Sequence, residues 1–486
     1  MDVILLADRR GQELLPLTDE SCPALLPFAG KMVIEHTFEA LVEAGLRQAH
    51  IVFPPEAENG KEALGGGERW GMRLEISLSR GEEPPLQIFA RWKQPPAAPF
   101  LILRGDIIRS CRIGDFLKQA EALAAQPCVA ARLSGQNAYM LLCRGPLGAY
   151  LNHLNWVDPA PYANAEADIP GVIALLDSLR AYHQANLDAA AGRLPSLLIP
   201  GRQIALGLTQ GRNTEAYPQN LKRGVAWIGS NSHLHPSVEL LGEVVIGDNV
   251  IIDRRVSIES SVILPHSYIG ELVELRNAIV RGNDLIRVDN GAILKITDSF
   301  LLADLKAANM NQNLRSVLSR IGGGILLALS LPLWVLAFAA SRRQNPAQPY
   351  VTRRLRGNKI EYNRENQPQR KEFSVGEWNV DAPALRYLPR LLAVISGDLE
   401  LIGALPVTME VAGHRTEEWQ KLADKAPAGL LGPTQLNVPA DAPEEEKLMS
   451  DSFYASNFSP KQDLYYLLQG FYALFSRKAW LRESDR

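Results

Sequence analysis

The side chains best placed for chemistry in this chain are four cations in the stretch RRLRGNK. They are Arg353, Arg354, Arg356 and Lys359, and they follow shortly after a long apolar segment. Basic side chains beside a membrane segment attract anionic lipid headgroups, and the same charges suit a phosphate-bearing substrate. A solvated run of surface charge explains the pattern equally well, so the sequence leaves both interpretations open.

The other reactive side chains exclude several kinds of chemistry. Cys22, Cys111, Cys128 and Cys143 have neither metal-ligand nor redox spacing, so we expect reduced, small apolar side chains. A net charge of −3 over 486 residues gives no excess of positive charge that would indicate nucleic acid. The composition, 46% hydrophobic and 22% charged, is ordinary for folded protein, and the length predicts about three domains.

One segment is long enough to cross a bilayer. Residues 321–341 are uncharged, and arginines flank them on both sides. Pro332, near the centre, removes a backbone donor and kinks a helix, and positive charge at both ends is unusual for a simple span. These features favour a re-entrant helix, broken at its centre, that enters and leaves on the cytoplasmic face. A true transmembrane span and a buried soluble helix are the alternatives.

Residues 1–212 alternate short apolar runs with amphipathic segments. We predict strands at residues 3–7, 49–53, 99–106 and 128–133, and helices at residues 32–46 and 113–126. Strands that alternate with helices predict a Rossmann-like α/β domain on a mostly parallel sheet.

Residues 213–300 contain an apolar repeat of six residues. One row of the repeat comprises Ile228, Leu234, Leu240, Ile246, Ile252, Ile258 and Leu264, and a second comprises Val238, Val244, Val250, Val256 and Val262. This period fits neither a helix nor an alternating strand, but it fits triangular coils of three hexads with aliphatic side chains stacked inside. It is typical of a left-handed parallel β-helix. We expect His233, His235 and His266 to be solvated loop residues rather than catalytic groups.

The first domain resembles the sugar-nucleotide pyrophosphorylases, which are nucleotidyltransferases. The resemblance runs through ADRRGQELLPLTDESCPALLPFAGKMVIEH at residues 7–36 and through RGD at residues 104–106. It implies the nucleotidyltransferase fold, nucleotide contacts at Gly11 and Lys31, and a metal ligand at Asp106.

The phosphate loop of that family is altered in this chain. The family has Gly-Gly-x-Gly-Thr-Arg, in which glycine lets the backbone approach the nucleotide phosphates. Here Asp8 and Arg9 replace the first two glycines, Glu13 replaces the arginine, and Pro23 stands where the family has a lysine. An anionic Glu13 repels a triphosphate, so we do not expect nucleotidyl transfer.

Residues 301–486 resemble the bacterial sugar transferases, which are polyprenyl-phosphate phosphoglycosyl transferases. The ordered matches are the apolar segment with its central Ser-Leu-Pro, RRLRGNK at 353–359, LPRLLAVISGDLELIGALP at 388–406, PAGLLGPTQL at 427–436 and DSFYASNFSPKQDL at 451–464. The resemblance implies a membrane-associated α/β domain that moves a phosphosugar from a nucleotide sugar to polyprenyl phosphate, through an aspartyl intermediate and Mg²⁺. It also implies a substrate contact at Gln435.

The groups that this reaction needs are missing from their expected positions. Phosphoryl transfer of this kind requires a carboxylate nucleophile, an acid that holds the metal and cations around the diphosphate. The family's Asp-Glu pair aligns with Arg386 and Tyr387, and the arginine of its Pro-Arg-Pro motif aligns with Leu405. Asp381 and Tyr387 are the remaining nucleophile candidates, although Asp381 lies several residues out of register and Tyr387 lacks an adjacent base.

The sequence therefore predicts a degenerate sugar transferase of bacterial cell-surface polysaccharide biosynthesis. It would act at the cytoplasmic face of the inner membrane as a scaffold or regulator of glycan assembly, without a cofactor. An active phosphoglycosyl transferase that uses Mg²⁺ and undecaprenyl phosphate is one alternative. Another is a sensor whose N-terminal domain binds a nucleotide sugar without chemistry. The expected partners are membrane lipids, glycan-assembly proteins, nucleotide sugar, polyprenyl phosphate and further copies of the chain, but not nucleic acid.

Overall fold

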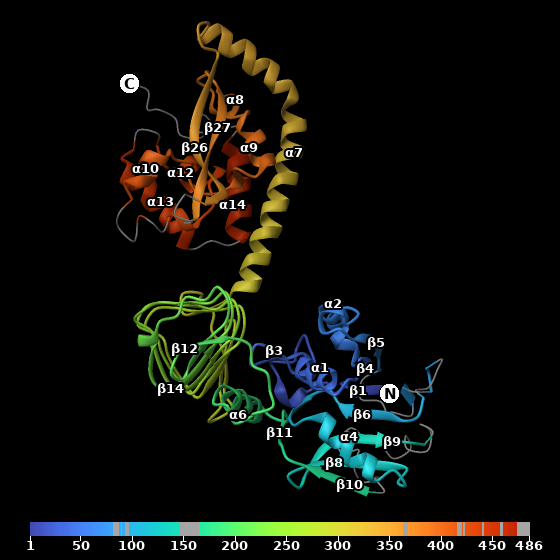
Figure 1. Cartoon of the computed structure of the whole chain (residues 1–486). Coiled ribbons are helices and arrows are strands. Elements are labelled where there is room, and N and C mark those ends of the chain that lie inside the picture. The colour runs from blue at the N-terminus through green and yellow to red at the C-terminus, as the bar shows by residue number, and fades with distance from the viewer. Residues whose placement is uncertain are drawn as a thin grey trace. The chain divides into compact units, whose positions relative to one another are not determined.

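The computed structural model describes residues 1–80, 87–88, 90–92, 97–145, 165–362, 368–415, 420, 423–439, 442–456 and 460–473. The chain divides into two compact units, Met1–Ala308 and Asn309–Arg486. The first unit contains an α/β domain and the hexad repeats, and the second contains the sugar-transferase-like region (Figure 1).

A mixed seven-stranded sheet forms the centre of the α/β domain. Its strands, in spatial order, are β10 (Ala165–Ile169), β8 (Cys128–Leu133), β9 (Gln136–Cys143), β6 (Phe100–Arg104), β1 (Asp2–Leu6), β4 (Gln48–Phe53) and β5 (Arg73–Leu78). The predicted strands are present, and the predicted helices are α1 (Val33–Glu43) and α4 (Ile113–Ala122). Both helices bury apolar side chains, among them Phe38 and Phe116, in the core that covers the sheet.

The sheet is less parallel than predicted. Strand β9 runs antiparallel to both of its neighbours, because a tight turn at Ser134 and Gly135 joins it directly to β8. Both turn residues have positive φ, as short hairpin turns require. The other elements of the domain are β2 (Pro27–Phe28), β3 (Lys31–Met32), α2 (Glu58–Leu64), β7 (Ile107–Ser110), β11 (Val172–Leu175) and α6 (Leu179–Ala190).

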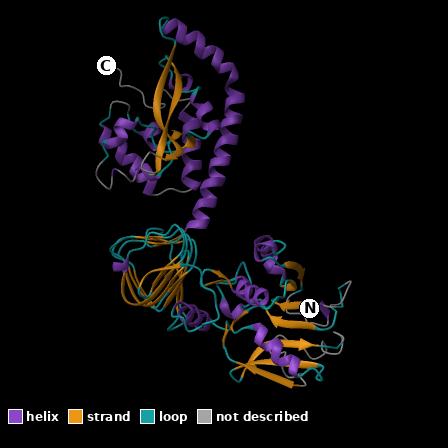
Figure 2. Ribbon diagram, viewed as in Figure 1, coloured by secondary structure: helices purple, strands orange, loops and turns teal. Residues whose placement is uncertain are grey.

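From Arg202 onward, short strands stack into coils, in which strands of successive coils pair in parallel, whereas the strands at the two ends of the repeat region pair antiparallel (Figure 2). Strands of adjacent coils pair in register, as Ala226 does with Val244 and Val262 does with Ile279. The strands are β12 (Arg202–Ala205), β13 (Leu208–Gln210), β14 (Leu221–Ile228), β15 (His233–Leu234), β16 (Glu239–Ile246), β17 (Ile251–Ile252), β18 (Ser257–Glu259), β19 (Val262–Ile263), β20 (Ser267–Ile269), β21 (Glu274–Arg276), β22 (Ala278–Arg281), β23 (Asp284–Arg287), β24 (Ile293–Lys295) and β25 (Leu302–Asp304).

The six-residue repeat predicts the interior of the coils correctly as far as Ile258. Both apolar rows up to that residue lie in the core inside the coils. The prediction is wrong for Val262 and Leu264, which pack outside that core, while Ile263 takes the interior position. The cause is a coil one residue shorter than three full hexads, which pairs Val245 with Val262. A shift of one residue moves a side chain to the opposite face of a strand.

The outward-facing apolar side chains of the coils form a stripe that joins them to the α/β domain. This outer stripe consists of Trp227, Val245, Val262 and Ile279, and it shares one core with Phe28 and with Tyr182 and Leu187 of α6. Polar contacts support it, since the indole of Trp227 donates to the Pro200 carbonyl at 2.7 Å and the His183 ring contacts the Ser260 carbonyl at 2.8 Å. The α/β domain and the coils are therefore one structural unit.

In the second unit, helices surround a long β-hairpin. Its elements are β26 (Tyr350–Tyr362), β27 (Pro368–Trp378), α8 (Pro383–Arg386), α9 (Arg390–Ser396), β28 (Glu400–Ile402), α10 (Met409–Gly413), β29 (Gly429–Leu431), α12 (Pro433–Asn437), α13 (Glu444–Ser456) and α14 (Pro460–Ala473). The matched stretch 388–406 forms α9, a turn and β28, and its apolar side chains build the core of this unit.

The apolar segment belongs to α7 (Leu305–Gln344), which bends towards its C-terminal end (Figure 1). The sequence predicts a re-entrant segment broken at Pro332, whereas α7 continues through Pro332 as one helix. In the helical turn that precedes Pro332, the Ser330 hydroxyl donates a hydrogen bond to the Leu327 carbonyl at 2.9 Å. Residues Arg315–Gln344 reach a mean hydropathy of 2.1 and are long and apolar enough to cross a membrane. Only 17% of their most apolar stretch is buried by protein.

Candidate functional site

Asp106, the predicted metal ligand, lies between two guanidinium groups. Arg104 binds both of its carboxylate oxygens, at 3.1 and 2.7 Å, and Arg9 Nε lies 2.8 Å from Oδ2. Burial raises the pKa of Asp106, but the charges of Arg104 and Arg9 outweigh this effect and hold the pKa below its usual value. Asp106 is therefore an ionised carboxylate whose charge is already neutralised by protein.

The loop that would hold phosphates is closed by its own side chains. Arg9 also pairs with Glu13 at 3.1 Å and donates to the Leu176 carbonyl at 2.6 Å. Gly11 lies against Pro23, so closely that a Cβ atom at Gly11 would overlap the proline ring, and its carbonyl accepts a hydrogen bond from Thr18 at 2.7 Å. The backbone and the cation that could meet a phosphate are engaged within the protein.

Lys31, the second predicted nucleotide contact, is engaged elsewhere. Its ammonium group pairs with Glu39 of α1 and donates to the Leu198 carbonyl at 2.7 Å. These contacts tie the start of α1 to the segment that leads into the coils. The structure therefore brings Asp106 and Arg9 together, but it does not add Lys31 to that group.

In the second unit, Arg386 and Tyr387 occupy the position of the expected carboxylate pair. Arg386 ends α8 and Tyr387 follows it, with the guanidinium of Arg390 4.3 Å from the centre of the Tyr387 ring. Arg390 binds the buried Glu377 through Nη2, and Arg353 Nε approaches the same carboxylate at 3.5 Å. The described residues place no carboxylate or histidine in hydrogen-bonding contact with the Tyr387 hydroxyl.

Asp381, the other nucleophile candidate, is exposed and lies just beyond β27. Its backbone N–H donates to the side chain of Gln344 at 3.1 Å, at the end of the hairpin where Tyr350 pairs with Trp378. Arg356 pairs with Glu372, six residues further along the hairpin. At about 3.3 Å per residue, this spacing separates Asp381 from the cations around Arg356 by roughly 20 Å.

The four cations of the basic stretch do not form one patch. Alternation along β26 directs Arg353 and Arg356 to opposite faces of the hairpin, where they pair with Glu377 and Asp424. Lys359 pairs with Asp398 at 3.0 Å. Arg354 is exposed and forms no ion pair within the described part of the chain.

Three arginines instead gather around Asp424, two at its carboxylate and one at its backbone carbonyl. Arg356 and Arg415 both bind Asp424, and Arg370 Nη2 donates to the carbonyls of Asp424 at 2.5 Å and Ala426 at 2.9 Å. Burial lowers the pKa of Arg370, and the positive charge of Arg356 lowers it further. This arginine cluster of three cations and one carboxylate lies beside Leu405, where the family has its phosphate-contacting arginine. Sequence reasoning missed Arg370 and Arg415, because they come from segments without a recognised motif.

A second buried polar cluster ties α7 to the rest of the unit. Arg315 Nε lies 3.0 Å from Glu400 and 2.9 Å from Asp463, and its Nη2 donates to the Tyr454 hydroxyl at 2.9 Å. Tyr454 in turn donates to Asp463 at 2.6 Å. Gln435, a predicted substrate contact, is buried and donates to the Gly429 carbonyl at 3.2 Å. These matched motif residues therefore make internal contacts between elements of the fold.

Comparison with known proteins supports the resemblance stated for each of the two domains. The nucleotidyl transferase family matches residues 2–138, and the bacterial sugar transferase family matches residues 360–477. The chain joins a nucleotidyl transferase domain to a bacterial sugar transferase domain. The bacterial sugar transferase family is membrane-associated, and α7 contains one candidate membrane helix.

Individual relatives match the nucleotidyl transferase side. A mannose-1-phosphate guanylyltransferase catalytic subunit beta from Danio rerio is 29% identical over 123 residues, which cover 24% of this chain and 34% of the relative. A UTP–glucose-1-phosphate uridylyltransferase from Synechocystis sp. is 20% identical over 351 residues, covering 60% of this chain and 90% of the relative. The chain thus spans about a third of the guanylyltransferase.

Nucleotidyl transferase domains typically use Mg²⁺, and the described residues do not fit such an ion. They contain no group of three or more His, Cys, Asp or Glu side chains arranged to hold a metal. Both oxygens of Asp106 accept hydrogen bonds from arginine. A metal at Asp106 would have to displace two guanidinium groups from a buried carboxylate.

The pairing around Asp106 predicts a structural role that can be measured. Replacing Asp106 with Asn removes the negative charge that Arg9 and Arg104 share. We therefore expect the free energy of unfolding to fall by about 3 kcal/mol. Chemical unfolding followed by tryptophan fluorescence measures this change. The control is Asp19→Asn, which removes the half-exposed pair with Arg281 and should cost less than about 1 kcal/mol. Equal stability of the two variants would contradict the structural role.

Asp451 gives a second prediction, on pH dependence. Its carboxylate accepts hydrogen bonds from Thr434 at 2.6 Å and Leu405 N–H at 3.1 Å, and burial raises its pKa to about 6. The folded state therefore prefers the protonated form, and this contribution to stability is lost as the pH rises from about 4 through 6. The ionised form costs about 3 kcal/mol at pH 7.5. The always neutral Asp451→Asn variant should therefore melt higher than the wild type at pH 7.5.

The advantage of Asp451→Asn should shrink towards pH 4. An asparagine can keep both contacts, because the Thr434 hydroxyl also lies 3.2 Å from the Lys447 carbonyl and can donate there. The exposed Asp381→Asn serves as a control that should leave the melting temperature unchanged. A lower melting temperature of Asp451→Asn at pH 7.5 would show that the ionised carboxylate stabilises the fold.

Proposed function

We propose that this chain is a membrane-associated, catalytically degenerate sugar transferase that acts as a scaffold or regulator of bacterial cell-surface glycan assembly. One observation carries the proposal. The Arg386 and Tyr387 positions, where the family has its carboxylate pair, adjoin Arg390, and the nearby Glu377 is already paired with Arg390 and Arg353. A guanidinium group can neither attack phosphorus nor hold Mg²⁺.

The N-terminal domain supports the same proposal. Its Asp106 is saturated by two arginines, and Arg9 and Glu13 neutralise one another within the phosphate loop. The apolar framework of each domain is complete, whereas the polar groups that chemistry requires are paired internally. A protein of this kind keeps the shape of a transferase and can still dock on membrane enzymes.

We place the protein at the cytoplasmic face of the inner membrane through α7. Apolar side chains along this helix are exposed, among them Leu329 at 72% and Val335 at 70%, and lipid would cover them. Arginines at both ends of the segment would lie at anionic headgroups. We also propose that the stacked coils form a left-handed β-helix, which their hexad period and the parallel pairing of adjacent coils support.

The proposal predicts that the purified protein transfers no phosphosugar. Full-length protein in nanodiscs is supplied with Mg²⁺, polyprenyl phosphate and mixed nucleotide sugars, and release of nucleoside monophosphate is measured. We expect no release above background, in preparations where an active member of the family turns over. Release that disappears in Asp381→Asn or in Tyr387→Phe would overturn the proposal and identify the nucleophile.

A nucleotide-sugar sensor is the second candidate, and the arginine cluster favours it. Arg356, Arg370 and Arg415 carry two more positive charges than Asp424 neutralises. Cations in a partly buried cluster bind phosphate oxygens well, because arginine offers paired donors. Such a site binds a diphosphate without needing a nucleophile.

Calorimetry on the full-length protein tests the sensor. We expect nucleotide sugars to bind, and Arg370→Gln to weaken their binding by about tenfold, the loss typical of one charge-assisted hydrogen bond. The control is Arg354→Gln, which removes an exposed cation of the same hairpin outside the cluster. No binding at millimolar ligand, or equal affinities of the two variants, would exclude the cluster as the sensor site.

A further inference from the structure

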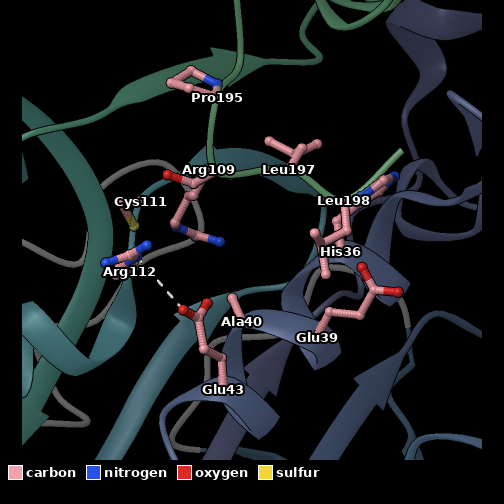
Figure 3. A pocket seen from close by; sticks show the side chains of 11 residues that line it. His36, Glu39, Ala40, Glu43, Arg109, Cys111, Arg112, Pro195, Leu197 and Leu198 are labelled. Carbon is pink, nitrogen blue, oxygen red and sulfur yellow. Dashed lines mark ion pairs between the residues drawn. The ribbon is translucent and has the colours of Figure 1, made fainter. Parts of the chain in front are cut away.

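The α/β domain contains a cavity of about 250 Å³ that the nucleotidyl transferase loop does not line (Figure 3). It lies between α1, the end of β7 and the segment around Leu198. Gly11, Pro23 and Asp106 are not among its walls. Figure 3 shows Arg109 reaching into the cavity, with Ala40 and Glu43 of α1 below it.

Arg109 brings a charge to this cavity that the described residues do not neutralise. Its Nε and Nη2 atoms donate to the carbonyls of Ala138, Arg104 and Tyr139, but Nη1 is enclosed and has no hydrogen-bond partner. No carboxylate in the described ranges forms an ion pair with Arg109. Burial lowers the pKa of Arg109 to about 10, so the side chain remains a cation at neutral pH. An enclosed cation without a counter-ion is costly.

The carboxylates in the cavity wall are already engaged. Glu39 pairs with Lys31, and Glu43 lies 3.5 Å from Arg112, as the dashed line in Figure 3 marks. The positive charge that remains facing the cavity is therefore that of Arg109.

His36 adds an acceptor of hydrogen bonds to the same wall. Its Nε2 lies 3.1 Å from the Phe28 carbonyl, which only accepts, so Nε2 must carry the proton in the neutral ring. Burial lowers the pKa of His36 to about 4, and the ring is therefore neutral at physiological pH. Its enclosed Nδ1 has a lone pair and no partner among the described residues. A ligand that completes this site must donate a hydrogen bond to Nδ1.

We propose that this cavity binds a small anion that also bears a hydroxyl group, either a hydroxylated carboxylate or a phosphate monoester. The anionic group would accept a hydrogen bond from Arg109 Nη1, and the hydroxyl would donate to His36 Nδ1. The volume of about 250 Å³ falls just below the roughly 300–1,000 Å³ typical of small-molecule sites, so a whole nucleotide sugar is too large. The site is independent of the proposed function, because it uses neither the phosphate loop nor the sugar transferase domain.

Calorimetry on the full-length protein in nanodiscs tests the site with two probes, glucuronate and glycerol 3-phosphate. We expect saturable binding of at least one probe and none of neutral glucose. Comparison of the two probes identifies the anionic group that the site prefers. Inorganic phosphate should bind at least about tenfold more weakly than glycerol 3-phosphate if that ester is the ligand, because phosphate lacks the carbon-borne hydroxyl.

Two variants make the test specific. Arg109→Lys keeps a positive charge but loses the planar donor fork, and we expect at least about tenfold weaker binding. Ala40→Leu removes no polar group, so a loss of binding in this variant cannot come from a buried charge or hydrogen bond that is lost. The larger leucine side chain should fill the cavity and abolish binding. The control is the exposed Arg73→Gln, which lies outside the cavity and should bind like the wild type. Absence of binding of both probes, or unchanged affinity in Ala40→Leu, would overturn the proposal.

Discussion

The constraint on which this molecule depends is the cost of burying an ionised group. A carboxylate inside a protein is tolerated only when hydrogen bonds and opposite charges replace water. In this chain arginine supplies that compensation at the buried Asp106 and Glu377 and at the partly buried Asp424. The same pairing that makes these carboxylates compatible with the fold withdraws them from metal binding and from nucleophilic attack. The burial of these carboxylates and their unavailability to a metal ion therefore have one physical cause in both domains.

Much of the fold could be predicted from the sequence, because its periodicities are strong. The apolar runs at residues 3–7 and 128–133 became strands, and the six-residue rows as far as Ile258 form the interior of the coils. The failures are local. A hairpin turn at Ser134 and Gly135 made β9 antiparallel, and one shortened coil exchanged Val262 for Ile263. Both depend on the number of residues between two pairing segments, which apolar patterning alone does not report.

The candidate sites could be predicted less well than the fold. Comparison of motifs located Asp106 and the Arg386–Tyr387 position, because these follow recognisable strands and helices. It did not reveal that Arg9 reaches Asp106, that Arg370 and Arg415 converge on Asp424, or that Arg109 and His36 face one cavity. These groups come from segments far apart in the chain. Their meeting depends on side-chain direction and tertiary packing, which a single sequence does not encode in any short pattern.

The shortened coil has a consequence for how this chain tolerates changes in length. Surface loops usually accept an extra residue at little cost. In the coil that ends at Val262, one added residue would restore the regular length of the repeat. It would also turn Val262 away from α6 and bring a neighbouring side chain to the interface with Tyr182 and Leu187. The irregular length of this coil therefore determines which side chains of the repeat face the α/β domain.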